Sequence, residues 1–431
     1  MNFKPTAPLS GFIELSPGAQ KCFDECAARM KGVFLAAGFK HIDLPAIERA
    51  EVLTDKDNLD EIETQMYLFK KGDTSMGLRY DQTVGLARYV AGGAGDLVFP
   101  FRAYQFGRNY RGERPKRGRY REFYQMDADI LGINSLSLNY DAEIVAVFSK
   151  AYESCAEYIG KTFIKVGSRP FWDAMFEYLG LGAEESKQVF VLIDKKDKIG
   201  DEFEPAVRGL IGAKADEIFR VFSEGYKSFR AKTAALSKAV DEIDEFMGQL
   251  DAMGIKNAEI DVSVMRGHAY YTGLVFEVFL EKLPELGSVG GGGRYADLCG
   301  KFGKTKIVGV GAAVGFSRMM VTLLDEGMID LSKFEDDVDT CVLVMDQGCV
   351  PFAMAILSKL RSAGIVSVPF LDVDKKFKSQ MEFANKICCK FSVIIGEDEV
   401  KNNTVTLKDM KSGEQKVLAP DEALKFLVKT K

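Results

Sequence analysis

YRGERPKRGRYREFYQMDADILG, residues 110–132, is the stretch of this sequence that most restricts the possible folds. Residues 108–121 hold seven basic side chains and one acidic side chain, and the sequence then becomes acidic. The segment 115–118, which contains Pro and Gly, is typical of a turn. Beyond the turn, one face of a predicted strand carries Phe123, Gln125, Asp127 and Asp129. The pattern predicts a β-hairpin with a long basic loop and a polar strand face.

The polar face of this hairpin needs water or a ligand opposite it, because buried polar groups without partners are costly. Arginines at one end and carboxylates at the other suit a zwitterion joined to phosphates. A solvated, charged hairpin is the alternative for a basic run considered alone. The rest of the sequence decides between the two interpretations.

Composition is that of an ordinary globular protein: 47% of the 431 residues are hydrophobic and 28% are charged. This length allows two or three domains. No apolar run approaches the length of a membrane span, and residues 1–18 show no secretory signal pattern. The eight cysteines lack CxxC spacing, which predicts reduced thiols in a cytoplasmic protein. Neither of the two histidines has ligand spacing to cysteines, so no protein-bound metal is predicted.

The net charge of −6 argues against a surface built for non-specific binding of nucleic acid. A local basic strip can nevertheless bind phosphates on an acidic body. The loop at 114–121 is a candidate for such a strip. The overall charge therefore leaves specific RNA binding open.

Four further strings carry candidate chemistry. LRYDQT at 78–83 precedes a predicted helix. For Asp81 and Thr83, the alternative to binding a ligand is a structural role as caps of that helix. RGHAYYTG at 266–273 lies between two predicted strands and carries an arginine and two tyrosines, whose hydroxyls could pair with an imidazole. GGGGRY at 290–295 could be only a flexible turn. VGVGAAVGFSR at 308–318 predicts a strand of small residues and a helix, in which Arg318 either contacts a nucleotide phosphate or is a surface charge.

Together these strings resemble the histidyl-tRNA synthetases, which belong to the class II aminoacyl-tRNA synthetases. Residues 111–125 are similar to motif 2 and residues 308–318 to motif 3 of that class. Residues 16–48, a predicted helix and short strand, resemble motif 1, which builds the dimer interface in class II enzymes. RGHAYYTG resembles the family string RGLDYYTG, with His268 and Ala269 in place of Leu-Asp. GGGGRY resembles the family segment GGGRY, which approaches the bound histidine. The resemblance covers nearly the whole chain.

The resemblance implies that histidine and ATP bind side by side, with Mg²⁺ on the outer phosphates of ATP. Three arginines are implied to be catalytic: Arg111 between the histidine carboxylate and the α-phosphate, Arg266 at the α-phosphate, and Arg318 at the γ-phosphate. The implied histidine-binding residues are Asp81, Thr83, Arg111, Gln125, Asp129, Arg266, Tyr270 and Tyr271. Among them, Asp81, Thr83 and Gln125 would hold the α-amino group, and Asp129 and Tyr271, beside Tyr270, would contact the imidazole. The implied ATP-binding residues are Arg111, Glu113, Arg119 and Arg318.

The expected fold is α+β: a class II antiparallel sheet flanked by helices, with a helical insertion and a C-terminal α/β domain. The expected boundaries are 1–169 and 254–332 for the catalytic core, 170–253 for the insertion and 333–339 for a linker. Residues 340–431 resemble the anticodon-binding domain of the same enzymes. Strands alternate with helices there, which predicts a parallel or mixed sheet.

The implied activity is that of a cytoplasmic homodimer, not bound to a membrane, that charges histidine tRNA. Histidine and ATP would form an adenylate and pyrophosphate, and transfer of the histidyl group to tRNA would release AMP. His268 is not expected to act as a general base, because attack by a carboxylate needs no proton removed. The rival interpretation is a non-catalytic relative that acts as a regulatory subunit of histidine biosynthesis. Such relatives lack the ATP arginines and usually the C-terminal domain, whereas this chain has Arg111, Arg266 and Arg318.

Overall fold

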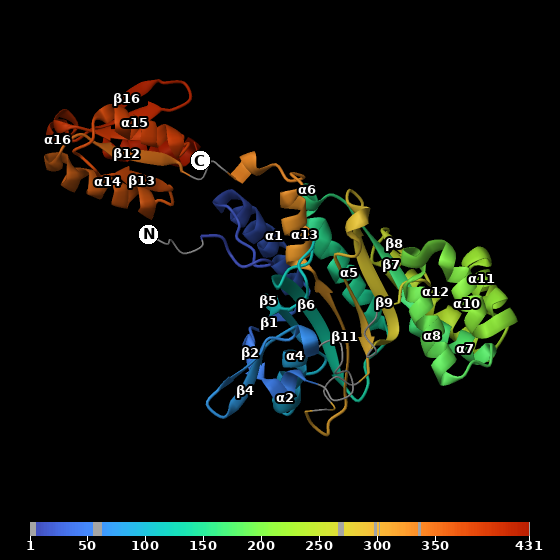
Figure 1. Ribbon diagram of the computed structural model, residues 1–431. Coiled ribbons are helices and arrows are strands. Elements are labelled where there is room, and N and C mark those ends of the chain that lie inside the picture. Colours follow the sequence, from blue (N-terminus) through green and yellow to red (C-terminus); the bar gives the residue numbers. More distant parts are fainter. Residues whose placement is uncertain are drawn as a thin grey trace. The chain divides into compact units, whose positions relative to one another are not determined.

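The computed structural model describes residues 6–54, 63–265, 271–296, 300, 302–334 and 338–430. The chain divides into two compact units, Met1–Leu15 with Phe23–Ile329, and Ser16–Cys22 with Asp330–Lys431. Their helices and strands are labelled in Figure 1. Among the described residues, no helix combines the length and the apolar character needed to cross a membrane.

An eight-stranded sheet forms the centre of the larger unit (Figure 1). In spatial order its strands are β1 (Lys40–His41), β5 (Phe101–Tyr110), β6 (Glu122–Ile133), β11 (Ile307–Val314), β10 (Gly290–Tyr295), β9 (Tyr271–Leu280), β7 (Thr162–Ser168) and β8 (Ala258–Ile260). Neighbouring strands are antiparallel except for the β1–β5 and β7–β8 pairs at the two edges. The predicted antiparallel sheet is confirmed.

Strands β5 and β6 form the predicted hairpin, with a continuous register from Phe101↔Leu131 to Tyr110↔Glu122. The tip of the loop turns between Lys116 and Arg119, which exchange backbone hydrogen bonds of 3.2 and 2.8 Å. Gly118 occupies the left-handed region with φ of 67°, where a side chain would strain the backbone. The turn predicted at residues 115–118 is therefore confirmed.

Three helices cover one face of the sheet: α1 (Pro17–Ala36), α5 (Asn139–Ser154) and α13 (Phe316–Asp325). The ring of Phe23 lies 5.4 Å from that of Tyr124 and 4.7 Å from that of Phe316, measured between centroids. Alternation along β6 places Tyr124, Met126 and Ala128 on this apolar side. The polar residues of β6 consequently face the opposite side, which α4 (Thr83–Gly93) partly covers.

The glycine run at 290–295 is the central strand β10, so the flexible-turn interpretation is wrong. Gly292 lies opposite Ala312, and a Cβ there would overlap the carbonyl oxygen of Gly311 and the Cβ of Ala312. Glycine is needed for this close approach of two strands. Arg294 points to the helical side, where its Nη2 donates to Asp141 Oδ1 on α5 at 2.6 Å.

The string around residues 261–277 contains one of the two predicted strands, β9. Residues 261–265 form a turn instead, because the Asp261 carboxylate accepts a hydrogen bond of 3.0 Å from the backbone N–H of Ser263. The predicted strand there is wrong. Arg266, His268 and Tyr270 lie outside the described residues.

A small sheet of β2 (Ile47–Arg49), β4 (Thr74–Leu78) and β3 (Leu68–Lys71) precedes α4, beside the short helix α2 (Ala50–Leu53). Strands β3 and β4 form a hairpin that turns at Gly72, with φ of 60°. Between β6 and β7, α5 is followed by the short helix α6 (Ala156–Ile159). The small sheet leads into residues 78–83, of which Tyr80, Asp81 and Thr83 lie at the polar side of the large sheet.

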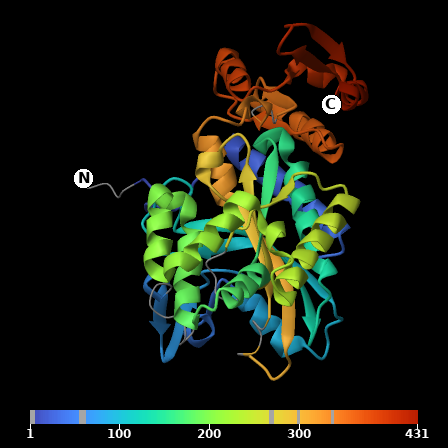
Figure 2. The ribbon, with the colours of Figure 1, turned by 90° about the vertical axis from the view of Figure 1, so that its right-hand side faces the viewer.

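Helices occupy the segment between β7 and β8, as predicted, and Figures 1 and 2 show them as one green group. They are α7 (Arg169–Tyr178), α8 (Ala183–Asp194), α9 (Lys196–Ile199), α10 (Phe203–Ile211), α11 (Ala215–Glu224) and α12 (Ala234–Ala252). Trp172 is fully buried in their core, and its Nε1 donates to the carbonyl oxygen of Val262 at 2.7 Å. These helices therefore share one hydrophobic cluster, which Val262 and Met265 of the following segment also join.

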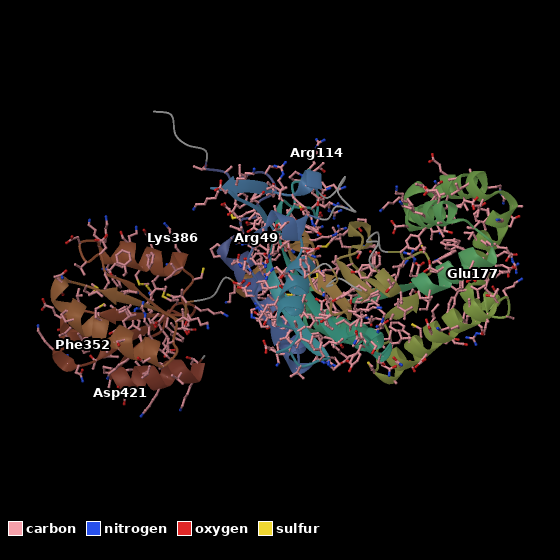
Figure 3. The ribbon with its side chains drawn as sticks, turned by 90° about the horizontal axis from the view of Figure 1, so that it is seen from below. Arg49, Arg114, Glu177, Phe352, Lys386 and Asp421 are labelled. Carbon is pink, nitrogen blue, oxygen red and sulfur yellow. The ribbon has the colours of Figure 1, made fainter. Side chains whose placement is uncertain are left out.

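The smaller unit contains a five-stranded mixed sheet in the order β13 (Ser367–Phe370), β12 (Thr340–Val344), β14 (Phe391–Ile395), β15 (Val405–Asp409) and β16 (Gln415–Leu418). The first three strands are parallel and the last two antiparallel. Helices α14 (Val350–Ser362) and α17 (Pro420–Thr430) pack on one face and α15 (Phe377–Lys386) on the other, while α16 (Glu397–Asn402) joins β14 to β15. Figure 3 labels Phe352 on α14 and Lys386 on α15, on opposite sides of the sheet. The predicted α/β unit is confirmed.

Candidate active site

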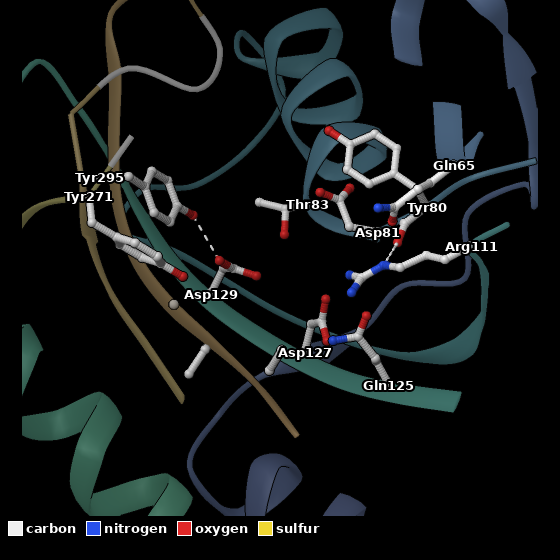
Figure 4. A pocket seen from close by; sticks show the side chains of 13 residues that line it. Gln65, Tyr80, Asp81, Thr83, Arg111, Gln125, Asp127, Asp129, Tyr271 and Tyr295 are labelled. Atoms are coloured by element: carbon white, nitrogen blue, oxygen red, sulfur yellow. Dashed lines mark hydrogen bonds between the residues drawn. The ribbon is translucent and has the colours of Figure 1, made fainter. Parts of the chain in front are cut away.

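A cavity of about 270 Å³ opens on the polar face of the large sheet, next to the first turn of α4 (Figure 4). Among the described residues, its lining combines three carboxylates, one arginine, several other polar groups and small residues of β11. The lining residues are Gln65, Tyr80, Asp81, Thr83, Arg111, Gln125, Asp127, Asp129, Tyr271, Tyr295, Gly311, Ala312 and Ala313. Such a mixture suits a small, charged ligand better than an apolar one.

The strand register explains why the carboxylates face this cavity. Gln125, Asp127 and Asp129 alternate along β6, and the last two lie opposite Ala313 and Gly311 of β11. A Cβ at Gly311 would overlap the carboxylate of Asp129. Small residues on β11 therefore leave the space in which the longer side chains of β6 meet a ligand.

Asp129 is held by a tyrosine from β10. The hydroxyl of Tyr295 donates to Asp129 Oδ1 at 2.8 Å, and both side chains are buried. Burial raises the pKa of Asp129 to about 7, although the hydrogen bond from Tyr295 opposes this shift. Tyr271, at the start of β9, lines the same part of the cavity. This corner can hold a group that offers one donor and one acceptor, as a neutral imidazole does.

Asp81 and Thr83 lie at the start of α4. Asp81 Oδ1 accepts a hydrogen bond of 3.1 Å from the backbone N–H of Val84, so its capping role is real, but Asp81 and Thr83 also line the cavity. Burial raises the pKa of Asp81. Nearby, Arg111 donates from Nε to the carbonyl oxygen of Tyr80 at 3.2 Å (Figure 4). Its guanidinium carbon lies 5.1 Å from the ring centre of Phe123. Its guanidinium is thereby oriented by the backbone and by an aromatic face.

A second cavity, of about 190 Å³, adjoins the first through three common lining residues: Arg111, Gln125 and Ala313. Its other lining residues are Glu113, Gly118, Arg119, Tyr120, Phe123, Ser288, Val289, Gly290, Gly315 and Arg318. Arg119 Nη1 donates to Glu113 Oε2 at 2.9 Å. In the described part of the chain, three arginines line this small space, which favours an anionic ligand.

Arg318 of α13 is more deeply placed than a surface charge would be. Its Nη2 donates to the carbonyl oxygen of Leu286, which lies in the short helical turn η5 (Pro284–Leu286). Burial lowers the pKa of Arg318, and the positive charge of Arg119 acts in the same direction. Two cations held close together in a partly desolvated site are stabilised when an anion binds between them.

The structure thus gathers the predicted residues into two neighbouring groups. Asp81, Thr83, Gln125, Asp129 and Tyr271 line the first cavity; Glu113, Arg119 and Arg318 line the second, and Arg111 lines both. The predicted contacts of Arg266 and Tyr270 lie outside the described residues.

Several lining residues were not predicted as site residues, among them Gln65, Tyr80, Asp127 and Tyr295. The alternation of β6 does contain the signal for Asp127, because it places this carboxylate on the same face as Gln125 and Asp129. No local signal marks the pairing of Tyr295 with Asp129, which joins strands far apart in the sequence. In the part of the chain that the structure describes, no cluster of His, Cys, Asp or Glu side chains could hold a metal ion.

Two family models match the chain in agreement with this geometry. The model for histidyl-tRNA synthetase matches residues 11–323, and the anticodon-binding domain model matches residues 339–430. The chain belongs to the histidyl-tRNA synthetase family. Both cavities lie within the segment that the first model matches.

Curated relatives and solved structures agree with this family. The histidine–tRNA ligase of Clostridium acetobutylicum is 35% identical, with 96% of this chain and 98% of the relative covered. That of Finegoldia magna is 34% identical, with 97% and 98% covered. The crystal structure of histidyl-tRNA synthetase from Nostoc sp. PCC 7120 matches with a TM-score of 0.85 and 28% identity over the full length of both chains.

A structure described as an ATP phosphoribosyltransferase regulatory subunit/histidyl-tRNA synthetase, from Bacillus halodurans C, matches with a TM-score of 0.73. It covers 89% of this chain and 97% of its own, at 19% identity. At that identity the match shows a shared fold alone.

Proposed function

We propose that the first cavity binds histidine, that the second binds ATP, and that Arg111 acts on both substrates at their junction. The chain attaches histidine to its tRNA in an ATP-dependent reaction. The carboxylate of histidine attacks the α-phosphate, pyrophosphate leaves, and the histidyl group then passes from the adenylate to a ribose hydroxyl of the tRNA, which releases AMP. The observation that carries the proposal is the sharing of Arg111, Gln125 and Ala313 by two cavities of different character.

Positioning and charge neutralisation are the main tasks of the protein in such a reaction. Arg111 would draw the histidine carboxylate and the α-phosphate together, and Arg318 would contact the γ-phosphate of ATP, with Glu113 and Arg119 beside it. Arg266 would offset charge on the α-phosphate.

Histidine would be recognised at both of its ends. Asp81, Thr83 and Gln125 would hold the α-amino group. Asp129 would accept from one imidazole nitrogen and Tyr271, beside Tyr270, would donate to the other. An amino acid without an imidazole would leave these buried groups unmatched, which is the strongest form of discrimination available to a binding site.

Mg²⁺ is proposed to accompany ATP. This ion binds through one or two carboxylates together with water and phosphate oxygens. Among the described residues that line the second cavity, Glu113 is the carboxylate, and Glu277 of β9 lies close enough to influence the pKa of Arg318. These residues fit a magnesium ion held mainly by the nucleotide. When bound, it would neutralise charge on the outer phosphates.

The remaining proposals concern organisation. Residues 1–169 and 254–332 would form the catalytic core, residues 170–253 an insertion beside the tRNA acceptor end, and residues 333–339 a linker. Residues 340–431 would bind the anticodon, which the family match at 339–430 supports. The protein is proposed to be a cytoplasmic homodimer.

The regulatory-subunit interpretation is disfavoured by the site itself. Arg111 and Arg318 line the second cavity, and the smaller unit that such relatives usually lack is present. Exchange of labelled pyrophosphate into ATP, run with each amino acid in turn, tests the proposal. Exchange that depends on histidine alone is expected. Binding of histidine without any exchange would favour a regulatory protein.

A further inference from the structure

Asp127 has a buried carboxylate that lines the first cavity, and one of its oxygens accepts no hydrogen bond from the described residues. The residue is 4% exposed, and within the described part of the protein its Oδ1 has no hydrogen-bond partner. Asp127 lies between Gln105 of β5 and Ala313 of β11 in the register of the sheet. It therefore faces the cavity from the middle of β6, one alternation from both Gln125 and Asp129 (Figure 4).

Among the described residues, the positive charges near Asp127 do not outweigh its burial and the nearby carboxylates. Burial raises its pKa well above the usual range, and the charges of Asp129 and Asp81 act in the same direction. The opposing charges come from Arg79 and Arg111. Arg79 donates from Nε to the Arg108 carbonyl oxygen and from Nη1 to the Leu44 carbonyl oxygen, both at 2.8 Å, so two of its three guanidinium nitrogens are committed to the backbone.

The facing residue on β5 does not supply a donor to Asp127 either. Gln105 uses Nε2 to donate to the carbonyl oxygen of Gln82 at 3.2 Å, and its own Oε1 is also without a partner in the described structure. Buried carboxylate oxygens are nearly always hydrogen-bonded, because leaving them unpaired is costly. An aspartate with a purely structural role would be paired within the protein, whereas this one is directed at a ligand cavity.

We propose that Asp127 binds the α-ammonium group of the substrate histidine. The inference rests on the proposed function and adds a residue to the substrate site. An ammonium group brings three N–H donors, and Asp127 Oδ1 is a further acceptor for them beside the groups already proposed, Asp81, Thr83 and Gln125. Gln125 Oε1 already accepts from Asn109 Nδ2 at 2.8 Å and keeps a second lone pair for the ligand.

This assignment also separates the tasks of the two aspartates near the ammonium. Asp81 Oδ1 caps α4 through the N–H of Val84, so Asp81 builds the wall of the cavity as well as contributing negative charge. Asp127 has no such backbone task among the described contacts. Its carboxylate is consequently the group whose pairing changes most when an ammonium ion enters the cavity.

The test compares two ligands that differ only in the ammonium group: histidine and 3-(imidazol-4-yl)propionate. Dissociation constants are measured by calorimetry for the full-length protein and for Asp127→Asn, which keeps the shape of the side chain and removes its charge. Asp127→Asn is expected to weaken histidine binding about tenfold or more and to change binding of the propionate less than about threefold. Asp129→Asn is the matched control from the same strand, and it is expected to weaken both ligands because both carry the imidazole.

Equal losses for the two ligands in Asp127→Asn, or no loss for histidine, would overturn the inference. If thermal unfolding shows that Asp127→Asn does not fold, Asp127→Ala gives the same comparison without a buried amide. Two other results would reject the proposed function instead. The unaltered protein would bind neither ligand, or Asp129→Asn would leave the binding of both ligands unchanged.

Discussion

Removal of the Tyr295 hydroxyl tests how the protein prepares Asp129 for an imidazole. In Tyr295→Phe the ring remains, so the buried packing is kept while the 2.8 Å hydrogen bond to Asp129 Oδ1 is lost. That bond favours the ionised carboxylate, against the burial that raises the pKa of Asp129 to about 7. A hydrogen bond to a charged group contributes about 1.5–3 kcal/mol, which corresponds to about one to two pKa units.

The pKa of Asp129 should therefore rise by about one to two units in Tyr295→Phe. In the proposed site the ionised form accepts the imidazole N–H, so the pH at which histidine affinity falls to half should move upward by a similar amount. The measurement is the dissociation constant of histidine from about pH 6 to pH 9 for both proteins. Since the free ligand titrates identically in both series, the difference between the profiles reports the protein group.

The sign of the accompanying stability change is also fixed. The pKa of Asp129 is higher in the folded protein than in the unfolded chain. Its contribution to the free energy of unfolding is therefore fully present below the pKa of the unfolded chain, and it is lost as the pH rises from there to about 7. In Tyr295→Phe this loss should continue to higher pH. Tyr158→Phe is a matched control, because Tyr158 donates to the Glu25 carboxylate at 2.6 Å away from both cavities. Coincident histidine profiles for Tyr295→Phe and the unaltered protein would refute this account of Asp129.

Three further predictions concern ATP, the sheet and the smaller unit. Arg318→Ala should weaken ATP binding by about tenfold or more while histidine binding stays within about twofold, because Arg318 lines the second cavity and not the first. Equilibrium titration of each substrate measures both affinities, and equal losses would contradict the prediction. Gly292→Ala should lower the unfolding temperature, because its Cβ would overlap the backbone of β11, and an unchanged unfolding temperature would refute the packing argument. The control Gly248→Ala, in an open position on α12, should raise the free energy of unfolding by about 1 kcal/mol. A chain ending at Asp339 should retain histidine-dependent pyrophosphate exchange but lose most tRNA charging, because both cavities precede this residue; undiminished charging by a folded truncated protein would reject the anticodon-binding role.

Much of the site could be predicted from the sequence because local periodicity determines which side chains share a strand face. The alternation of Gln125 and Asp129, the turn at Gly118 and the small residues of β11 all follow from patterns within a few residues. The glycine run at 290–295 was harder to interpret. Its role as a buried strand depends on the approach of Gly311 and Ala312, which the local sequence does not show.

Other features depend on contacts between distant segments. The bond from Tyr295 to Asp129 and the bond from Arg318 to the Leu286 carbonyl are made by tertiary packing and leave no local pattern. The sequence predicts two strands around RGHAYYTG, but before this string the carboxylate of Asp261 turns the chain locally. Asp127 was visible on the polar face of β6, yet its unpaired oxygen could be recognised only once its neighbours were placed.

The central claim, that adjoining cavities take histidine and ATP around Arg111, is tested most directly with a stable histidyl-adenylate analogue. One molecule that fills both cavities pays the entropic cost of association once and should bind at least about a hundredfold more tightly than either histidine or ATP. The measurement is its dissociation constant for the full chain, with the alanyl analogue as the control. Tight binding of the histidyl analogue alone is predicted. An affinity no greater than that of ATP, or equal affinity for both analogues, would contradict the account.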